Sequence, residues 1–367
     1  MEYFSLWYVI LLFSYFLILF GYMYFSYKPD TLNNILGFIT LLSVFFHISL
    51  FLLLMNHADE LKTSHVPLFT LSLAIPLFVV GMLILISTGL PFLFKGNIKE
   101  KFIKLGNKME EKLEIWSKAK KDTLRKLNHV LLFIFLVIFW NIGLFIVIDY
   151  AGSSSGMIPE GNNMLLLYAR LLNDPDSIVE VLFSFGWFYY LLFFLFYIFF
   201  LFALANEFTR KSKHFSFLFN IFPKLYLTHE EKQSYGTYLY FAIGQLFAAL
   251  ICPPMVFLAI LGISAISDLV TSQIGIRYGK IHISWNDNKT WEGTVAGIIV
   301  SFWICLLFVG ILWSFIFTII FLICDLFTSK PIKISDNLLI PIACSLTYIA
   351  IRFFFNFNYS SIITGWI

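Results

Sequence analysis

A short stretch in the second half of the chain gathers residue types that can do chemistry. Between positions 264 and 280, small and polar residues recur at offsets of 0, 3, 4, 7, 8 and 11: Ser264, Ser267, Asp268, Thr271, Ser272 and Gly275. This spacing predicts that they share one face of a helix. A carboxylate within an otherwise apolar helix is costly, so Asp268 is a candidate functional residue. Small residues at such spacing also occur where two helices pack closely.

The loop that follows has the composition of a phosphate-binding site. It reads RYGKIHISWNDNKTWEG over 277–293 and supplies Gly279, Lys280, Lys289 and Glu292. Glycine lets a backbone approach a ligand closely, and lysine supplies a point charge for phosphate. Magnesium usually takes one or two carboxylates plus substrate phosphates, which Asp268 and Glu292 can provide. The combination predicts a nucleotide–magnesium site, and an ordinary cytoplasmic loop with lysines remains the alternative.

Two motifs in this region resemble the CTP-dependent lipid-transferase superfamily. They are Asp268-x-x-x-Ser272-x-x-Gly275-x-x-x-Gly279-Lys280 and, over 288–294, Asn-Lys-Thr-Trp-Glu-Gly-Thr. That superfamily includes the dolichol, polyprenol, phytol and diacylglycerol kinases and the phosphatidate cytidylyltransferases. The resemblance covers about 120–345.

Other segments resemble the kinase branch in particular. They are RKLNH at 125–129, SYGT at 234–237 with FAIG at 241–244, and DNLLIP at 336–341, where Leu339 stands in place of the family's Thr. The long C-terminal signature of the cytidylyltransferases is absent. The kinase is therefore the favoured reading, and a cytidylyltransferase that makes a CDP-lipid is the alternative.

The resemblance implies transfer of the γ-phosphate of CTP to a lipid hydroxyl, with Mg²⁺. It implies that Asp268 binds the metal or activates the lipid hydroxyl, and that Glu292 is a second metal ligand or a base. Lys289 would be the third catalytic residue. Asp336 would be a further metal ligand. Phosphate and nucleotide contacts would come from Gly275, Gly279, Lys280, Lys289, Thr290, Gly293, Arg125 and Lys126. Ser272, Asn337 and His129 would close the site around the lipid.

Three of these assignments have simpler alternatives. Asp336 can be a helix cap, Arg125 and Lys126 can anchor the end of a span, and His129 can be structural. The acceptor lipid stays open among dolichol, a shorter polyprenol, phytol and diacylglycerol.

Composition places this site in a membrane protein. Of the 367 residues, 59% are hydrophobic and only 13% are charged, with a mean hydropathy of +0.84. Soluble domains carry about 25% charged residues. The sequence predicts an all-α polytopic transmembrane bundle of about ten spans, near 6–27, 35–55, 67–94, 129–149, 181–205, 236–252, 254–273, 293–309, 311–327 and 336–355. The apolar run 293–327 is divided at Gly310 because one helix of about 52 Å exceeds a hydrocarbon core of about 30 Å.

Three regions are predicted: an N-terminal accessory bundle (1–94) dispensable for chemistry, a basic cytoplasmic or interfacial segment (95–128), and a catalytic core (129–367). The basic segment holds eleven of the 25 Lys and Arg residues, and 100–124 has the spacing of an interfacial amphipathic helix. Positive charge also places 207–235, 274–292 and 328–335 in the cytoplasm, opposite the acidic 151–180. The active site is expected on the cytoplasmic face, in the endoplasmic reticulum of a eukaryote or the plasma membrane of a prokaryote.

Several other classes of protein fit the sequence less well. The basic run lies between apolar spans, so an anionic leaflet explains it better than nucleic acid does. The four cysteines lie in apolar stretches without a C-x-x-C pair, so no zinc site or disulfide framework is expected. A transporter would carry polar sites in both halves, whereas here they gather in the C-terminal half. A transporter or scaffold is the non-enzyme alternative, and the sequence does not predict an oligomeric state.

Overall fold

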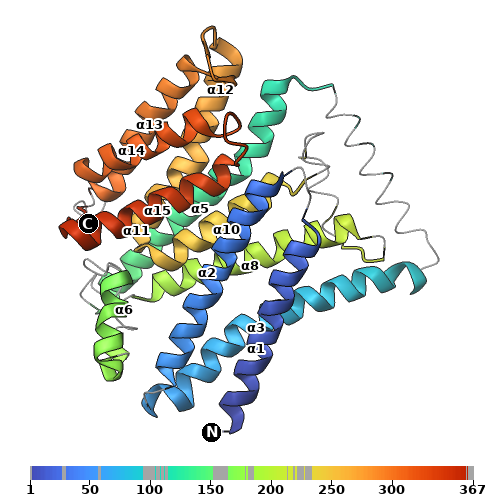
Figure 1. Ribbon diagram of the computed structural model, residues 1–367, viewed down its shortest axis with the longest axis vertical. Helices are drawn as coiled ribbons and strands as arrows, with labels where there is room; N and C mark the ends of the chain where they lie inside the picture. Colours follow the sequence, from blue (N-terminus) through green and yellow to red (C-terminus); the bar gives the residue numbers. More distant parts are fainter. Residues whose placement is uncertain are drawn as a thin grey trace.

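The described part of the chain folds as a bundle of α-helices (Figure 1) and contains one small two-stranded sheet. The computed structural model describes residues 2–26, 30–56, 59–93, 104, 108, 111, 115–151, 164–177, 179–180, 186–212, 214–217, 220, 227, 234–360 and 362. In this part of the chain, seven helices are long and apolar enough to cross a membrane, and three shorter apolar helices accompany them. The predicted all-α polytopic bundle of about ten spans is therefore confirmed.

The ten span helices follow the predicted order. The first five are α1 (Glu2–Tyr24), α2 (Thr31–Met55), α3 (Asp59–Leu93), α5 (Lys118–Ala151) and α8 (Gly186–Lys211). Next come α10 (Thr237–Ile251) and a long interrupted helix made of α11 (Pro254–Gly262), the π-helical segment η4 (Ile263–Ser267) and α12 (Asp268–Tyr278). The last three are α13 (Trp291–Val309), α14 (Ile311–Phe327) and α15 (Asp336–Phe355).

Some elements were not predicted. A short helix α6 (Met164–Asn173) and a 3-10 turn η2 (Pro175–Ser177) lie within the predicted loop 151–180. Strands β1 (His282–Ile283) and β2 (Asn286–Thr290) pair as an antiparallel hairpin within the predicted loop 274–292. Of the predicted interfacial helix at 100–124, residues 100–103, 105–107, 109–110 and 112–114 lie outside the described residues, and α5 begins at Lys118.

Helix α10 lies at the centre of the bundle. Thirteen of its fifteen residues are buried, and it packs against α15, α8 and α2. A β-carbon on Gly244 would lie 2.9 Å from the backbone oxygen of Asn337 and 3.1 Å from Pro341, so glycine is needed for α15 to come this close. Close approach through small residues is how helices associate in a membrane.

The predicted break at Gly310 is also confirmed. Gly310 has φ +81° and ψ 177°, a conformation that side-chain-bearing residues rarely adopt, and it separates α13 from α14. The two helices then run antiparallel, because Thr294 at the start of α13 donates a hydrogen bond to Asp325 at the end of α14. The chain thus turns back to the end from which α13 started (Figure 1).

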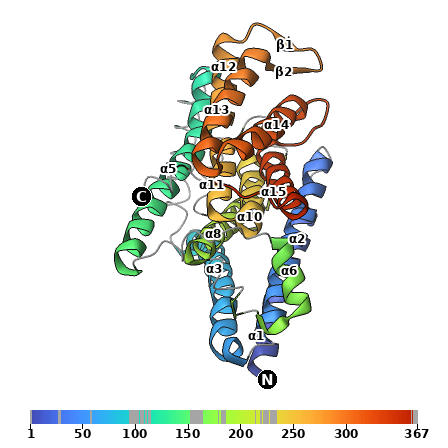
Figure 2. The ribbon, with the colours of Figure 1, turned by 90° about the vertical axis from the view of Figure 1, so that its left-hand side faces the viewer.

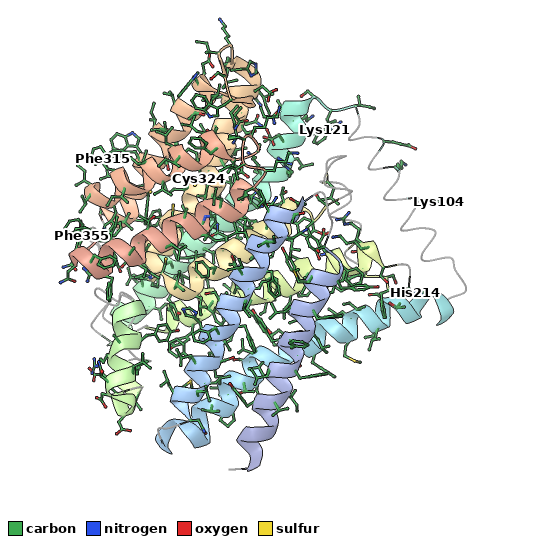
Figure 3. The ribbon with its side chains drawn as sticks, viewed as in Figure 1. Lys104, Lys121, His214, Phe315, Cys324 and Phe355 are labelled. Atoms are coloured by element: carbon green, nitrogen blue, oxygen red, sulfur yellow. The ribbon has the colours of Figure 1, made fainter. Side chains whose placement is uncertain are left out.

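Polar connections gather at one end of the bundle. Lys211 of α8 donates to the Phe25 carbonyl, Gln273 of α12 to that of Ala119, and Asn286 of β2 to that of Thr328. Asn286 and Thr328 belong to two of the segments that are predicted to share one side, and these two segments are in contact. Figure 3 shows Lys104, Lys121 and His214 along one side of the molecule, and Phe315 and Phe355 on the opposite side. Figure 2 shows the β1–β2 hairpin projecting from the α12–α13 end, far from the N-terminus.

Candidate active site

Asp268 is buried against a lysine from another helix. It is the first residue of α12, directly after the π-helical turn η4, and π-helical turns often occur at functional sites. Asp268 is 5% exposed, and its Oδ2 lies 2.8 Å from Nζ of Lys126 on α5. The same ammonium group donates to the backbone oxygen of Asp268 at 3.0 Å. The predicted residues Asp268 and Lys126 are thus brought together as a buried ion pair.

A second ion-pair group forms around Lys289 at the end of the hairpin. Its Nζ lies 2.6 Å from Oδ1 of Asp325 and 3.6 Å from Oδ2 of Asp336. The other oxygen of Asp325 accepts a hydrogen bond from Thr294 at 2.5 Å. Lys289 therefore ties the hairpin to the end of α14 and the start of α15, and Asp336 faces this lysine in addition to its place at the start of a helix.

The two ion-pair groups form one electrostatic cluster. Burial alone lowers the pKa of Lys289, but the carboxylates of Asp325, Asp336 and Asp268 outweigh burial and hold this pKa well above its ordinary value. Lys289 is therefore protonated at neutral pH. Three carboxylates face two ammonium groups, which leaves one negative charge in excess. We call Lys126, Asp268, Lys289, Asp325 and Asp336 the charged cluster.

Asp122 holds the neighbouring polar residues in place. It accepts hydrogen bonds from Ser272 and from Nε2 of Gln273, and Arg125 lies 3.1 Å from its Oδ1. Arg125 and Ser272 are thus positioned on either side of one carboxylate between α5 and α12. This arrangement fixes the register of the two helices beside the charged cluster.

The predicted glycines pack α12 against α13. A β-carbon on Gly293 would lie 2.6 Å from the Thr271 carbonyl oxygen, and one on Gly279 would lie 2.4 Å from the Gly275 carbonyl oxygen. One on Gly275 would lie 3.1 Å from the hydroxyl oxygen of Thr290. That hydroxyl accepts from the backbone N–H of Gly293 and caps α13. These residues set the distance between the elements that carry Asp268 and Lys289.

Glu292 lies in a different environment from Asp268. Its carboxylate accepts from the backbone N–H groups of Lys280 and Ile281, which closes the loop over the start of α13. Residues two apart on a helix point in roughly opposite directions, and Thr294 is the one that faces Asp325. The Glu292 carboxylate is thus bonded to the backbone of the loop, whereas the Asp268 carboxylate is paired with Lys126.

The remaining predicted residues surround the cluster less closely. The His129 ring stacks on Phe241 of α10, with ring centroids 3.8 Å apart. Its Nδ1 is buried and lacks a hydrogen-bond partner among the described residues. Lys280 is exposed, and Asn337 follows Asp336 in the first turn of α15 and is partly buried.

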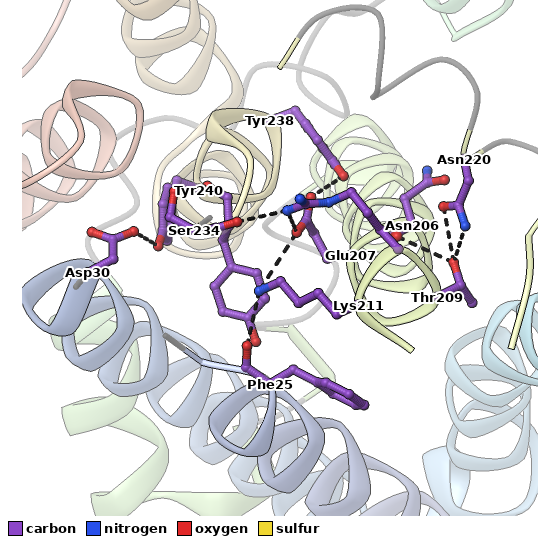
Figure 4. Close-up of polar contacts among 12 residues, drawn as sticks. Phe25, Asp30, Asn206, Glu207, Thr209, Lys211, Asn220, Ser234, Tyr238 and Tyr240 are labelled. Atoms are coloured by element: carbon purple, nitrogen blue, oxygen red, sulfur yellow. Dashed lines mark hydrogen bonds and ion pairs between the residues drawn. The ribbon is translucent and has the colours of Figure 1, made fainter. Parts of the chain in front are cut away.

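The N-terminal helices contact the segment that leads to Asp336. Asn33 of α2 is 7% exposed, and its Oδ1 accepts from the backbone N–H of Ser335 at 2.7 Å. Its amide group donates to Asp30, which also accepts from Tyr240 of α10 (Figure 4). Residues 1–94 are therefore linked by hydrogen bonds to both α10 and α15.

A second polar group lies at the same end, around Glu207 (Figure 4). Glu207 is fully buried on α8, pairs with Arg210, and accepts a hydrogen bond from Tyr238. Lys211 lies 3.2 Å from the centroid of the Tyr235 ring. Arg210 also donates to the Ser234 carbonyl at 2.7 Å. These contacts neutralise Glu207 inside the bundle and fix the entry to α10.

The carboxylates of the charged cluster are the described residues that could help to hold a magnesium–nucleotide complex. Among the residues that the structure describes, no three His, Cys, Asp or Glu side chains are grouped so as to hold a metal ion. Magnesium needs only one or two carboxylates when phosphates supply further oxygens. Asp336 is the most exposed carboxylate of the charged cluster, at 23%, and its contact with Lys289 is the longest. With the excess negative charge, Asp336 and Asp268 are the residues suited to this ion.

Two residues of this site were missed from the sequence. Asp325 lies within the apolar segment ICDLF, and Asp122 lies within the basic run. The signal for Asp325 was present, because a carboxylate in a membrane span marks a functional position by default. Asp122 gave no comparable signal, since its neighbours are charged. No family model, no curated protein and no solved structure matches the chain.

Proposed function

We propose that this chain is a membrane-embedded lipid kinase that transfers the γ-phosphate of CTP to a lipid hydroxyl, with Mg²⁺. The observation that supports this most is the charged cluster, in which α5, α12, β2, α14 and α15 bring three carboxylates and two lysines together at the polar end of an apolar bundle. A lipid can keep its tail in the bilayer while its hydroxyl meets a nucleotide there. The resemblance of the surrounding motifs to the CTP-dependent kinases supplies the donor and the reaction.

The roles follow from the contacts. Asp268 accepts the proton of the lipid hydroxyl, and Lys126 holds its carboxylate in position. Asp336 and Asp268 would hold the magnesium ion, and the ion would supply the positive charge that offsets charge on the transferred phosphoryl group. Lys289 orients Asp325 and Asp336 and adds positive charge. Phosphoryl transfer depends mainly on such positioning and charge neutralisation.

The test is label transfer by the purified full chain. The protein in detergent receives Mg²⁺, a mixed lipid extract, and CTP labelled at either the γ- or the α-phosphate. We expect label from the γ-position in lipid, and the labelled species names the acceptor. Label from the α-position alone would identify a cytidylyltransferase. Absence of label from both positions, with folded protein, would overturn the enzymatic proposal and leave a transporter or scaffold.

The site itself is tested by substitution. Asp268→Asn and Lys289→Ala are expected to reduce label transfer to background. The matched control is Asp287→Asn, because Asp287 is an exposed carboxylate on the same hairpin whose ion pair with Lys330 lies outside the charged cluster. Full activity in Asp268→Asn would show that the reaction, if present, occurs elsewhere.

A further inference from the structure

A pocket of about 510 Å³ lies on the outer side of the first turns of α5, next to the end of α12. Its lining includes Trp116, Lys120, Leu124, Leu127 and Arg277. Lys120 extends over the Trp116 ring, with Nζ 4.2 Å from the ring centroid. The pocket therefore has an aromatic wall, an apolar floor and two cationic side chains.

Among the residues that the structure describes, the charged side chains that line this pocket are those of Lys120 and Arg277, and both are positive. The nearest acid along α5 is Asp122, which is occupied by Ser272, Gln273 and Arg125 on the side that faces α12. A ligand that fills the pocket thus meets two cations, and an anionic group is the complement to them.

An apolar stripe continues from the pocket along α5. Leu127 lines the pocket, and Leu131, Phe135, Ile138 and Ile142 follow it, all exposed. Their spacing of 4, 8, 11 and 15 residues from Leu127 keeps them on one face of the helix. The stripe is about 22 Å long at 1.5 Å per residue, long enough for an acyl chain in one leaflet of a bilayer whose core is about 30 Å thick.

We propose that this pocket and stripe bind an anionic phospholipid. The head-group phosphate lies between Lys120 and Arg277, and the acyl chains lie along the exposed face of α5. Tryptophan is favoured at the level of lipid head groups, and Trp116 lies three residues before the apolar span that begins at Ala119. Basic pockets beside transmembrane helices are known to hold anionic head groups. The bound lipid would stabilise the position of α5, whose buried side carries Lys126 of the charged cluster, and the site is independent of the proposed kinase activity.

The test measures which lipids stay with the full-length protein. The chain is reconstituted in nanodiscs of phosphatidylcholine with a minority of phosphatidylglycerol, released into mild detergent, and analysed by native mass spectrometry. We expect retention of phosphatidylglycerol in excess of its share of the bilayer. The variant Lys120→Gln/Arg277→Gln should lower this preference on the order of tenfold. Thr123→Trp, which fills the pocket without changing charge, should also lower it.

The control removes the same amount of charge elsewhere. Lys330→Gln/Lys333→Gln takes two exposed basic residues from the 328–335 connection at the same polar end, and it should leave the preference intact. Equal loss in the control and pocket variants would overturn the proposal in favour of a general charge effect. Retention of phosphatidylcholine as readily as phosphatidylglycerol would overturn it in favour of an ordinary lipid annulus.

Discussion

At the scale of single residues, the charged cluster is a set of interdependent contacts. Asp325 is 2% exposed and bonds both Lys289 and Thr294, and Lys289 in turn faces Asp336. Removing one partner of a buried ion pair costs about 3–5 kcal/mol because the other charge stays buried without compensation. Removing both partners leaves the cluster with two carboxylates and one lysine, which is the same net charge as before.

Because the net charge is kept when both partners are removed, the double variant should differ from the single variant in stability but not in activity. Asp325→Asn should lower the unfolding temperature in detergent and abolish label transfer. The double variant Asp325→Asn/Lys289→Met should recover much of the lost stability, since no lysine then remains without its closest carboxylate, but none of the activity. Thermal unfolding and label transfer on the same preparations measure both. A double variant whose losses in stability are the sum of the two single losses would contradict the coupling.

At the scale of elements, most of the fold can be predicted from hydropathy and helix length. The ten span helices follow the predicted order because each buries or exposes an apolar surface that its sequence displays directly. The hairpin β1–β2 was missed because its strands are too short and too polar to give a period-2 pattern: β2 reads NDNKT.

The candidate site was predicted in part. Asp268, Lys289, Lys126 and Asp336 converge, whereas Glu292 is directed to the loop and Asp325 approaches only because α14 turns back at Gly310. Such a tertiary approach has no local signal in the sequence.

Gly310 makes the turn between α13 and α14 testable. Gly310→Ala places a β-carbon at φ +81°, 2.6 Å from the Ser360 carbonyl oxygen. We expect a loss of about 1–3 kcal/mol of stability, the usual cost of such a conformation. The control is Gly81→Ala on α3, where nothing lies within 4 Å of the added carbon and the helix should gain up to about 1 kcal/mol. Equal unfolding temperatures for the wild type and Gly310→Ala would show that the turn tolerates a side chain.

At the scale of the whole molecule, the N-terminal helices are joined to the candidate site. The sequence favoured an accessory bundle dispensable for chemistry, but Asn33 of α2 bonds the backbone of Ser335, the residue before Asp336. Asn33→Ala would leave that N–H without its partner, at a cost of about 1–3 kcal/mol, and free the start of α15. We expect slower label transfer well below the unfolding temperature. Thr40→Ala is the matched control, since Thr40 is equally buried on α2 and its hydroxyl bonds only its own helix. Unchanged turnover in Asn33→Ala would instead support the prediction that residues 1–94 are dispensable for chemistry.

The orientation of the bundle decides whether the polar end can receive a cytosolic nucleotide. The four cysteines are buried, so an introduced cysteine can be labelled over a low background. Lys330 is exposed at the polar end, and Asp176 is exposed in η2, within the predicted extracytoplasmic segment 151–180. In sealed vesicles with the cytoplasmic face outward, a membrane-impermeant maleimide should label Lys330→Cys but label Asp176→Cys only after permeabilisation. The reverse pattern would place the charged cluster on the side that lacks CTP, and the proposed kinase would then have no donor.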